Sequence, residues 1–202
     1  QGTTVVTNLS FPRSDAEQRF EAKATISLTP SHSLVGSYLE IERTRSGSTF
    51  GSVLDLRSLN NRTDPQDIKA VNYNGILTSN FFLEAQYSER QYEIATGFGG
   101  PPDLIDGTLL RHRATGRRYW SSTFCGTCEP EIRNNEDQLI KGSYFLSTQS
   151  GSHDFVFGYD TFSDIRFSVN HQSGSDFQVW ADDIVVGNDD TIYSQFSGPA
   201  TW

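Results

Sequence analysis

The sequence predicts an all-β chain that forms an antiparallel segment of a transmembrane β-barrel, with long extracellular loops and short periplasmic turns. Three observations predict this fold class: a hairpin motif recurs, its strands alternate apolar and polar residues, and short connections alternate with long ones. A period of two places apolar side chains on one face of a strand and polar side chains on the other. A barrel wall one side chain deep, with lipid outside and water inside, has this pattern.

The recurring motif lies where one strand turns into the next. Residues 31–38 (SHSLVGSY) match residues 152–159 (SHDFVFGY), and a looser third copy covers residues 77–89. Each copy places a tyrosine at corresponding positions of the same predicted face, and a tyrosine ring prefers the boundary between hydrocarbon and water. The alternative is ordinary aromatic packing in a soluble sandwich. The residues predicted to form an aromatic girdle are Tyr38, Tyr87 and Tyr159.

Six strands are expected in the three hairpins. Between residues 20 and 28 every second residue is apolar, and the residues between them are polar or charged. Phe82 interrupts the alternation of its strand, and the sequence alone does not explain it. No segment has a convincing helical period. The expected hairpin strands are 20–28, 34–43, 71–77, 81–89, 139–146 and 155–163, with further strands at 177–180, 183–186 and 192–196.

Connections within the hairpins are expected to be short, and those between hairpins long. Short turns at one end of a sheet and long loops at the other are typical of outer-membrane barrels. Loops of such length are uncommon in a compact soluble domain. The expected turns are 29–33, 78–80 and 149–152, and the expected loops are 11–15, 44–67 and 92–138.

Composition limits the classes of function. Hydrophobic residues make up 35% of the chain and aromatic residues 12%, which is little for a thick soluble core. The formal net charge of −9 disfavours nucleic acid as a partner, because phosphate binding needs clustered Lys and Arg. No apolar run reaches the length of a membrane helix. The chain has no Met and no signal-peptide pattern, so we expect a processed product or a piece of a longer chain.

Cys125 and Cys128 form an isolated C-x-x-C pattern. The preferred interpretation is a small loop disulfide formed in an oxidising compartment. A zinc site needs about four ligands, and a redox C-x-x-C belongs beside a βαβ unit, neither of which the sequence provides. Metal binding and redox chemistry remain the alternatives.

One basic and aromatic segment is a candidate ligand contact on an outer loop, the alternative being a loop strand packed on its neighbours. No catalytic, cofactor-binding or metal-binding residue is predicted, because no serine lies in a nucleophile elbow and Glu84 lies on the polar face as a solvated residue. We therefore expect a protein that is not an enzyme and needs no cofactor. The segment consists of Arg117, Arg118, Tyr119 and Trp120.

Residues 20–34 (FEAKATISLTPSHSL) resemble the barrel hairpins of TonB-dependent outer-membrane receptors, and the chain is most similar to the Oar-type subgroup. Segments 72–88, 119–128 and 171–176 carry the most specific similarity, which covers roughly residues 19–180. The resemblance implies a 22-strand barrel with an N-terminal plug, located in the outer membrane of a Gram-negative bacterium and driven through TonB by the inner-membrane proton gradient.

The plug, the TonB box and a closing terminal strand of that family are not found, so residues 1–202 are expected to be a partial barrel domain from the middle of the wall. Six strands do not easily close a barrel, for which eight is the usual minimum. The resemblance implies active uptake of a ligand. The implied partners are outer-membrane lipid, the remainder of the barrel and plug, the TonB complex through the missing N-terminal part, and a ligand that the sequence does not identify.

Two alternatives stand beside this interpretation. The first is a secreted all-β carbohydrate-binding module, a lectin-like sandwich that binds sugar with its loops. The second is a fragment of an all-β glycoside hydrolase. A continuous antiparallel sheet with an uncovered apolar face favours the barrel, whereas burial of Leu34, Leu83 and Phe155 against a second sheet favours the sandwich.

Overall fold

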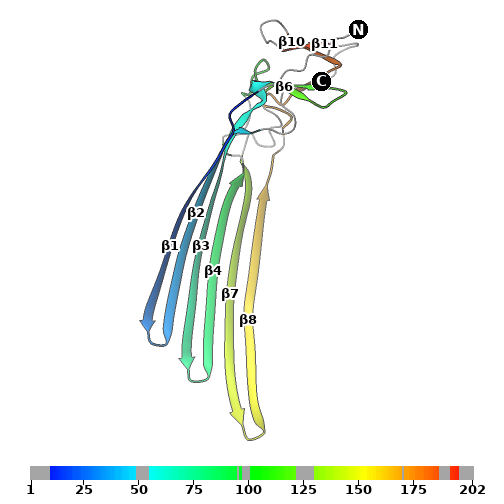
Figure 1. Cartoon of the computed structure of the whole chain (residues 1–202). Coiled ribbons are helices and arrows are strands. Elements are labelled where there is room, and N and C mark those ends of the chain that lie inside the picture. The colour runs from blue at the N-terminus through cyan, green and yellow to red at the C-terminus, as the bar shows by residue number, and fades with distance from the viewer. Residues whose placement is uncertain are drawn as a thin grey trace.

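The computed structural model describes residues 10–48, 55–94, 96, 101–121, 130–169, 171–186 and 192–195. The all-β prediction is confirmed: these residues form eleven strands, most of them paired antiparallel, with one short 3₁₀ turn and no α-helix (Figure 1). No helix in these ranges is long and apolar enough to cross a membrane.

All three predicted hairpins join in one continuous antiparallel sheet. Its six strands have the order β1-β2-β3-β4-β7-β8, so each hairpin pairs with the next along the chain. The backbone ladder is nearly unbroken from one edge strand to the other. The strands are β1 (Ser14–Thr29), β2 (His32–Ser48), β3 (Asn60–Thr78), β4 (Phe81–Ile94), β7 (Glu131–Thr148) and β8 (Gly151–Phe167).

The hairpin turns are tighter than predicted. Each has two residues, at 30–31, 79–80 and 149–150, because the strands extend to the edge of each turn. All three turns lie at the same end of the sheet and descend stepwise from β1–β2 to β7–β8 (Figure 1). Each turn is hydrogen-bonded to the next hairpin along the sheet. The Ile76 amide donates to the Ser31 carbonyl at 2.8 Å, and the Phe145 amide donates to the Asn80 carbonyl at 2.9 Å.

At the other end, the strands are longer than the alternation predicted. The expected loops at 11–15, 44–67 and 92–138 are wrong at their margins, because strand pairing continues into them. Charged residues occupy both faces there, which removes the alternation but leaves the ladder intact. Cross-strand ion pairs support it: Arg43 donates through Nε to Asp15 Oδ1 at 2.8 Å across β1 and β2. The long connections therefore shrink to residues 49–59 and 95–130.

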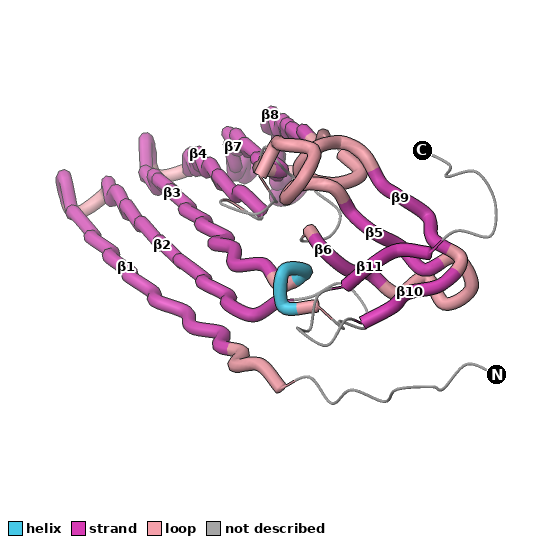
Figure 2. The backbone as a smooth tube through the Cα atoms, turned by 90° about the horizontal axis from the view of Figure 1, so that it is seen from above, coloured by secondary structure: helices cyan, strands magenta, loops and turns pink. Residues whose placement is uncertain are grey.

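The remaining elements lie beyond the strand ends that are opposite the turns (Figures 1 and 2). A three-stranded sheet has the order β6-β5-β9, in which β5 and β9 are parallel and β5 and β6 antiparallel. A separate pair joins β10 and β11. The bounds are η1 (Leu56–Ser58), β5 (Leu109–His112), β6 (Arg118–Trp120), β9 (Gln178–Ala181), β10 (Asp183–Val186) and β11 (Ile192–Gln195).

The buried apolar core of the described chain belongs to this three-stranded sheet, not to the six-stranded one. Its contact cluster consists of Leu110, Tyr119, Val179 and Ala181, with Trp120 and Ile184 packed against it, and Leu109 of β5 is also buried. The large apolar side chains of the long strands, by contrast, are exposed or half-buried. The six-stranded sheet is thus a single layer within the part of the chain that the structure describes.

Candidate functional site

One face of the six-stranded sheet is an apolar surface whose large side chains are exposed or half-buried. Directly opposed residues share a face of a sheet, and one register row crosses all six strands with only apolar or aromatic residues. Its members on β1, β7 and β8 are exposed, with Ile26 52%, Ile140 53% and Tyr159 65% exposed, and its members on β2, β3 and β4 are half-buried. The row consists of Ile26, Leu34, Tyr73, Ala85, Ile140 and Tyr159.

Nearer the turns, aromatic rings cover a glycine on the same face. Gly142 lies between Leu83 and Phe157 in the register. A Cβ at Gly142 would meet the Phe157 ring at 2.8 Å and the Phe81 ring at 3.0 Å. The two rings are themselves stacked, with centroids 6.1 Å apart and 20° between their planes. Glycine at this position leaves the room that both rings occupy.

A second glycine on this face supports a polar aromatic pair. Gly75 lies beside His32 in the register, and a Cβ at Gly75 would meet the Tyr73 hydroxyl and the His32 ring. With that space open, His32 Nδ1 and the Tyr73 hydroxyl form a hydrogen bond of 2.7 Å. The rings are stacked at 6.0 Å. The pair satisfies two polar groups in the part of this face that is nearest the turns, where most neighbouring side chains are apolar.

Away from the turns, the same face changes from apolar to charged. In the row that contains Tyr38, the next three partners are Lys69, Glu89 and Glu136. The Tyr38 hydroxyl donates to Glu40 at 3.1 Å, one row further on. The apolar part of this face therefore ends at the row of Tyr38, where the other side chains are charged and the tyrosine hydroxyl is hydrogen-bonded to a carboxylate.

The three predicted girdle tyrosines lie on this face. Tyr38, Tyr87 and Tyr159 occupy three successive rows, each one row closer to the turns than the last. Tyr87 is 40% and Tyr159 65% exposed. The shared face was predicted correctly; the role as an interfacial girdle stays a prediction.

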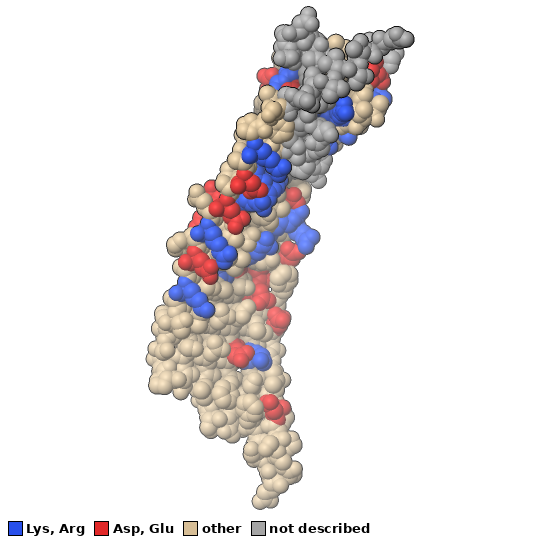
Figure 3. Space-filling model, viewed as in Figure 1, with Lys and Arg blue, Asp and Glu red and all other residues tan. Residues whose placement is uncertain are grey.

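The opposite face is polar along most of its length. One row reads Ser27, Ser33, Asn74, Glu84, Lys141 and Gly158 across the sheet, and Lys141 Nζ lies 3.3 Å from Glu84 Oε2. In the view of Figure 3, charged side chains gather over the half of the sheet that lies away from the turns.

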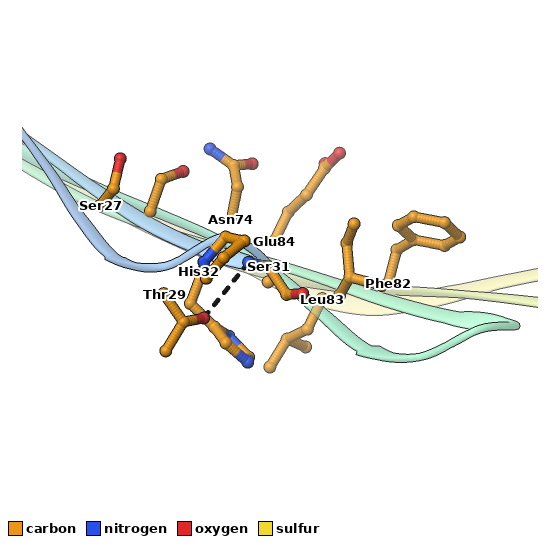
Figure 4. Close-up of a pocket in the computed structure, with 12 residues that line it drawn as sticks. Ser27, Thr29, Ser31, His32, Asn74, Phe82, Leu83 and Glu84 are labelled. Atoms are coloured by element: carbon orange, nitrogen blue, oxygen red, sulfur yellow. Dashed lines mark hydrogen bonds between the residues drawn. The ribbon is translucent and has the colours of Figure 1, made fainter.

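Phe82, which broke the alternation, lies on the polar face close to the turns. Its ring packs edge-on against Phe145 of β7, at 5.6 Å and 85°. Figure 4 shows it on the same side as Ser27, Asn74 and Glu84, around a shallow hollow of about 290 Å³ where the β1–β2 hairpin ends, with Leu83 on the other side. The polar face is thus also apolar at its turn end, which a strict period of two does not predict.

No protein-family model, characterised protein or solved structure matches this chain.

The three-stranded sheet buries part of the predicted loop contact, residues 117–120, and leaves the rest exposed or half-buried. Tyr119 is 4% exposed and belongs to the core, so its ring packs on its neighbours, as the alternative interpretation described. Burial raises the pKa of Tyr119. Arg117 is exposed, whereas Arg118 is half-buried and its pKa is lowered, first by burial and then by the charge of Arg111.

The three-stranded sheet places two further residues in the register row of Arg118, and the sequence analysis named neither of them as a candidate contact. Arg111 of β5 lies between Arg118 of β6 and Trp180 of β9 in one register row, and its guanidinium lies 4.3 Å from the Trp180 ring centroid. Residues so far apart in sequence meet here through the parallel pairing of β5 with β9. Local periodicity carries no signal of that pairing.

The remaining predicted site falls outside the described residues: Cys125 and Cys128 lie in segment 122–129. Among the residues that the structure does describe, no group of three or more His, Cys, Asp or Glu side chains could hold a metal ion.

Proposed function

We propose that this chain forms part of the wall of an outer-membrane β-barrel, with its apolar face against lipid and its polar face toward the barrel interior. The observation that carries the proposal is the apolar row that crosses all six strands, in which every side chain is exposed or half-buried. Soluble monomers rarely expose a continuous apolar patch beyond a few hundred Å². A hydrocarbon surround removes the cost of that exposure.

Strand length supports the same arrangement. The long strands have between 14 and 19 residues, whereas a tilted strand crosses the hydrocarbon with about 9–11. The excess lies at the end where both faces carry charge, which suits an extension into water beyond the membrane. Two-residue turns at the opposite end match the short periplasmic turns of outer-membrane barrels.

The two edges of the sheet support a larger barrel. Among the described strands, β1 and β8 each pair on one side only. Unpaired backbone groups in hydrocarbon cost several kcal/mol each, so the wall requires further strands on both sides. In our proposal these belong to the rest of the same barrel.

The more specific function rests on the resemblance of residues 20–34 and 72–88 to TonB-dependent receptors of the Oar type. On that basis we propose that the barrel takes up a ligand actively, contains a plug and receives energy through the TonB complex of a Gram-negative cell. A lectin-like sandwich would bury this apolar face against a second sheet, whereas Phe155 is 50% exposed and Leu34 and Leu83 are half-buried.

Two neighbouring substitutions on the central strand β4 test the lipid-facing role. Ala85 belongs to the apolar row and Gln86 to the polar face. In the full-length protein, Ala85→Arg should destabilise the membrane-inserted barrel by about 2–4 kcal/mol, because a lipid-facing arginine is costly near the midplane. Gln86→Arg should change stability by no more than about 0.5 kcal/mol.

The measurement is urea unfolding of the protein reconstituted in phospholipid vesicles, with outer-membrane assembly scored in cells. The proposal would be contradicted if both substitutions changed the free energy of unfolding equally, or if the protein remained soluble and folded without lipid.

A further inference from the structure

We infer that the polar face of the six-stranded sheet binds an extended, uncharged peptide that carries two apolar side chains. The site consists of two neighbouring hollows on β3 and β4, toward the turn end of the sheet. The inference deepens the proposed function and rests on it in one respect: the proposed function places this face in the interior of the barrel, where a ligand in transit would meet it.

The two hollows share part of their lining. Each has a volume of about 290 Å³, and Asn74 and Glu84 line both of them. These two residues are direct cross-strand partners, and Figure 4 shows their side chains on the same side of the sheet. The second hollow reaches the next row away from the turns, where Asn72 is opposed to Gln86. The hollows are therefore neighbours along β3 and β4.

The hollows contain polar side chains whose hydrogen-bonding capacity is open. Among the residues that the structure describes, neither Asn72 nor Asn74 has a side-chain hydrogen-bond partner, although Asn72 is half-buried. The charges beside them are matched, because Lys141 Nζ lies 3.3 Å from Glu84 Oε2. A side-chain amide both donates and accepts hydrogen bonds. These asparagines therefore suit the neutral N–H and C=O groups of a peptide better than they suit a charged ligand.

Apolar side chains lie at both ends of these amides. Ile76 and Phe82 are opposed at the turn end, line the first hollow and are 44% and 36% exposed. Val35 and Leu139 line the second hollow, in the row of Asn72, and are half-buried. The two apolar rows are thus separated by the four residues from Asn72 to Ile76, or about 13 Å along β3.

That separation matches the geometry of an extended peptide. Side chains at positions i and i+4 of an extended chain point to the same side and are also about 13 Å apart. Such a peptide would place one apolar side chain in each row and its central amide groups over the asparagines. A sugar chain would satisfy the asparagines but has no alkyl side chains for the two apolar rows, so the observations favour a peptide.

The test is calorimetric titration of the full-length protein, solubilised in a neutral detergent, with the blocked peptide acetyl-Leu-Gly-Gly-Gly-Leu-amide. We expect saturable binding that weakens about tenfold or more when serine replaces both leucines, because the apolar rows then lose their contacts. Shortening the spacer to one glycine should weaken binding by a similar factor, since only one leucine then reaches an apolar row. Maltotetraose, as the comparison ligand, should bind more weakly than the leucine peptide.

Asparagine substitutions locate the site. Asn72→Ala and Asn74→Ala should each weaken binding of the leucine peptide about threefold to tenfold, because each removes hydrogen bonds to the ligand. Asn135→Ala is the matched control and should leave the affinity unchanged. Asn135 lies on β7 four residues from Leu139, so it shares the polar face, but it lines neither hollow.

Three outcomes would overturn the inference: no saturable binding of the leucine peptide to the unmodified protein, tighter binding of maltotetraose, or equal losses in all three variants. The barrel proposal is tested separately, by the free energies of unfolding of the Ala85→Arg and Gln86→Arg proteins. A protein that inserts into membranes without binding the peptide contradicts this inference alone, and one that binds the peptide but remains soluble without lipid contradicts the barrel alone.

Discussion

Tyr87 lies one register row closer to the hairpin turns than Tyr38, although their side chains share a face and only β3 separates their strands. Tyr159 lies one row closer again, two strands further along the sheet. The line through the three tyrosines therefore drops by one residue per strand. With a rise of about 3.3 Å per residue and about 4.8 Å between strands, that slope is about 35°, which lies within the strand tilt of outer-membrane barrels.

This slope predicts that the three tyrosines lie at one depth in the bilayer. Tryptophan placed singly at 38, 87 or 159, in a full-length protein whose own tryptophans are replaced by phenylalanine, should be quenched alike by lipids brominated at one acyl position. Strands parallel to the membrane normal would instead separate successive sites by about 6.6 Å. Three clearly different quenching depths would contradict the tilt, and equal exposure to an aqueous quencher would contradict membrane insertion.

The sequence predicted the six long strands and their faces because each hairpin alternates with a period of two. The ends of the strands were missed where that signal stops. Around Arg43 and Asp15, charged residues lie on both faces, and backbone pairing continues between strands that also form a cross-strand ion pair. Phe82 was unexplained because its partner, Phe145, lies on a strand that joins β4 only after a long connection.

The loop sheet was the least predictable part. Its parallel β5–β9 pair joins residues about seventy positions apart, and no local pattern encodes such a contact. The sequence analysis named Arg118 as a candidate contact. It did not name Arg111 and Trp180, which lie in the same register row.

Because two aromatic rings cover Gly142, alanine should be far more destabilising there than at Gly36, another glycine of the apolar face. Gly142→Ala should destabilise the folded barrel by about 1–3 kcal/mol, since the new methyl group would push the Phe81 and Phe157 rings out of position. Gly36→Ala is the control, because the methyl group that it adds would meet no heavy atom within 4 Å, and it should be neutral or slightly stabilising. Urea unfolding of the reconstituted full-length protein measures both. A Gly142→Ala barrel as stable as the Gly36→Ala barrel would show that the rings do not need the glycine.

The hydrogen bond between His32 and Tyr73 predicts a measurable coupling across β2 and β3. Tyr73→Phe removes the hydroxyl that lies 2.7 Å from His32 Nδ1, and His32→Phe removes the ring nitrogen. A double-mutant cycle on unfolding free energies should give a coupling of about 0.5–1.5 kcal/mol, the usual net value of one hydrogen bond. Additive effects of the two substitutions would mean that the bond contributes nothing to stability.

The turn at Asp103 predicts a local loss of structure in acid. Asp103 Oδ1 accepts from the amides of Ile105 at 2.9 Å and Asp106 at 2.8 Å. These bonds, that from Asp106 first, lower the pKa of Asp103 from its ordinary value of 3.8, against an opposing effect of desolvation. A carboxyl group with a lowered folded pKa stabilises the turn above its unfolded pKa, and that stabilisation is lost as the pH falls through the folded pKa.

Amide hydrogen exchange at Ile105 and Asp106, followed as a function of pH, measures this loss. Protection should persist down to pH 3.8 and disappear below it, after correction for the intrinsic exchange rate. Asp103→Asn keeps one acceptor oxygen but has no charge to lose, so its protection should be independent of pH over the same range. If protection in the unmodified protein fails at or above pH 3.8, the carboxylate does not hold the turn in the way that its two hydrogen bonds indicate.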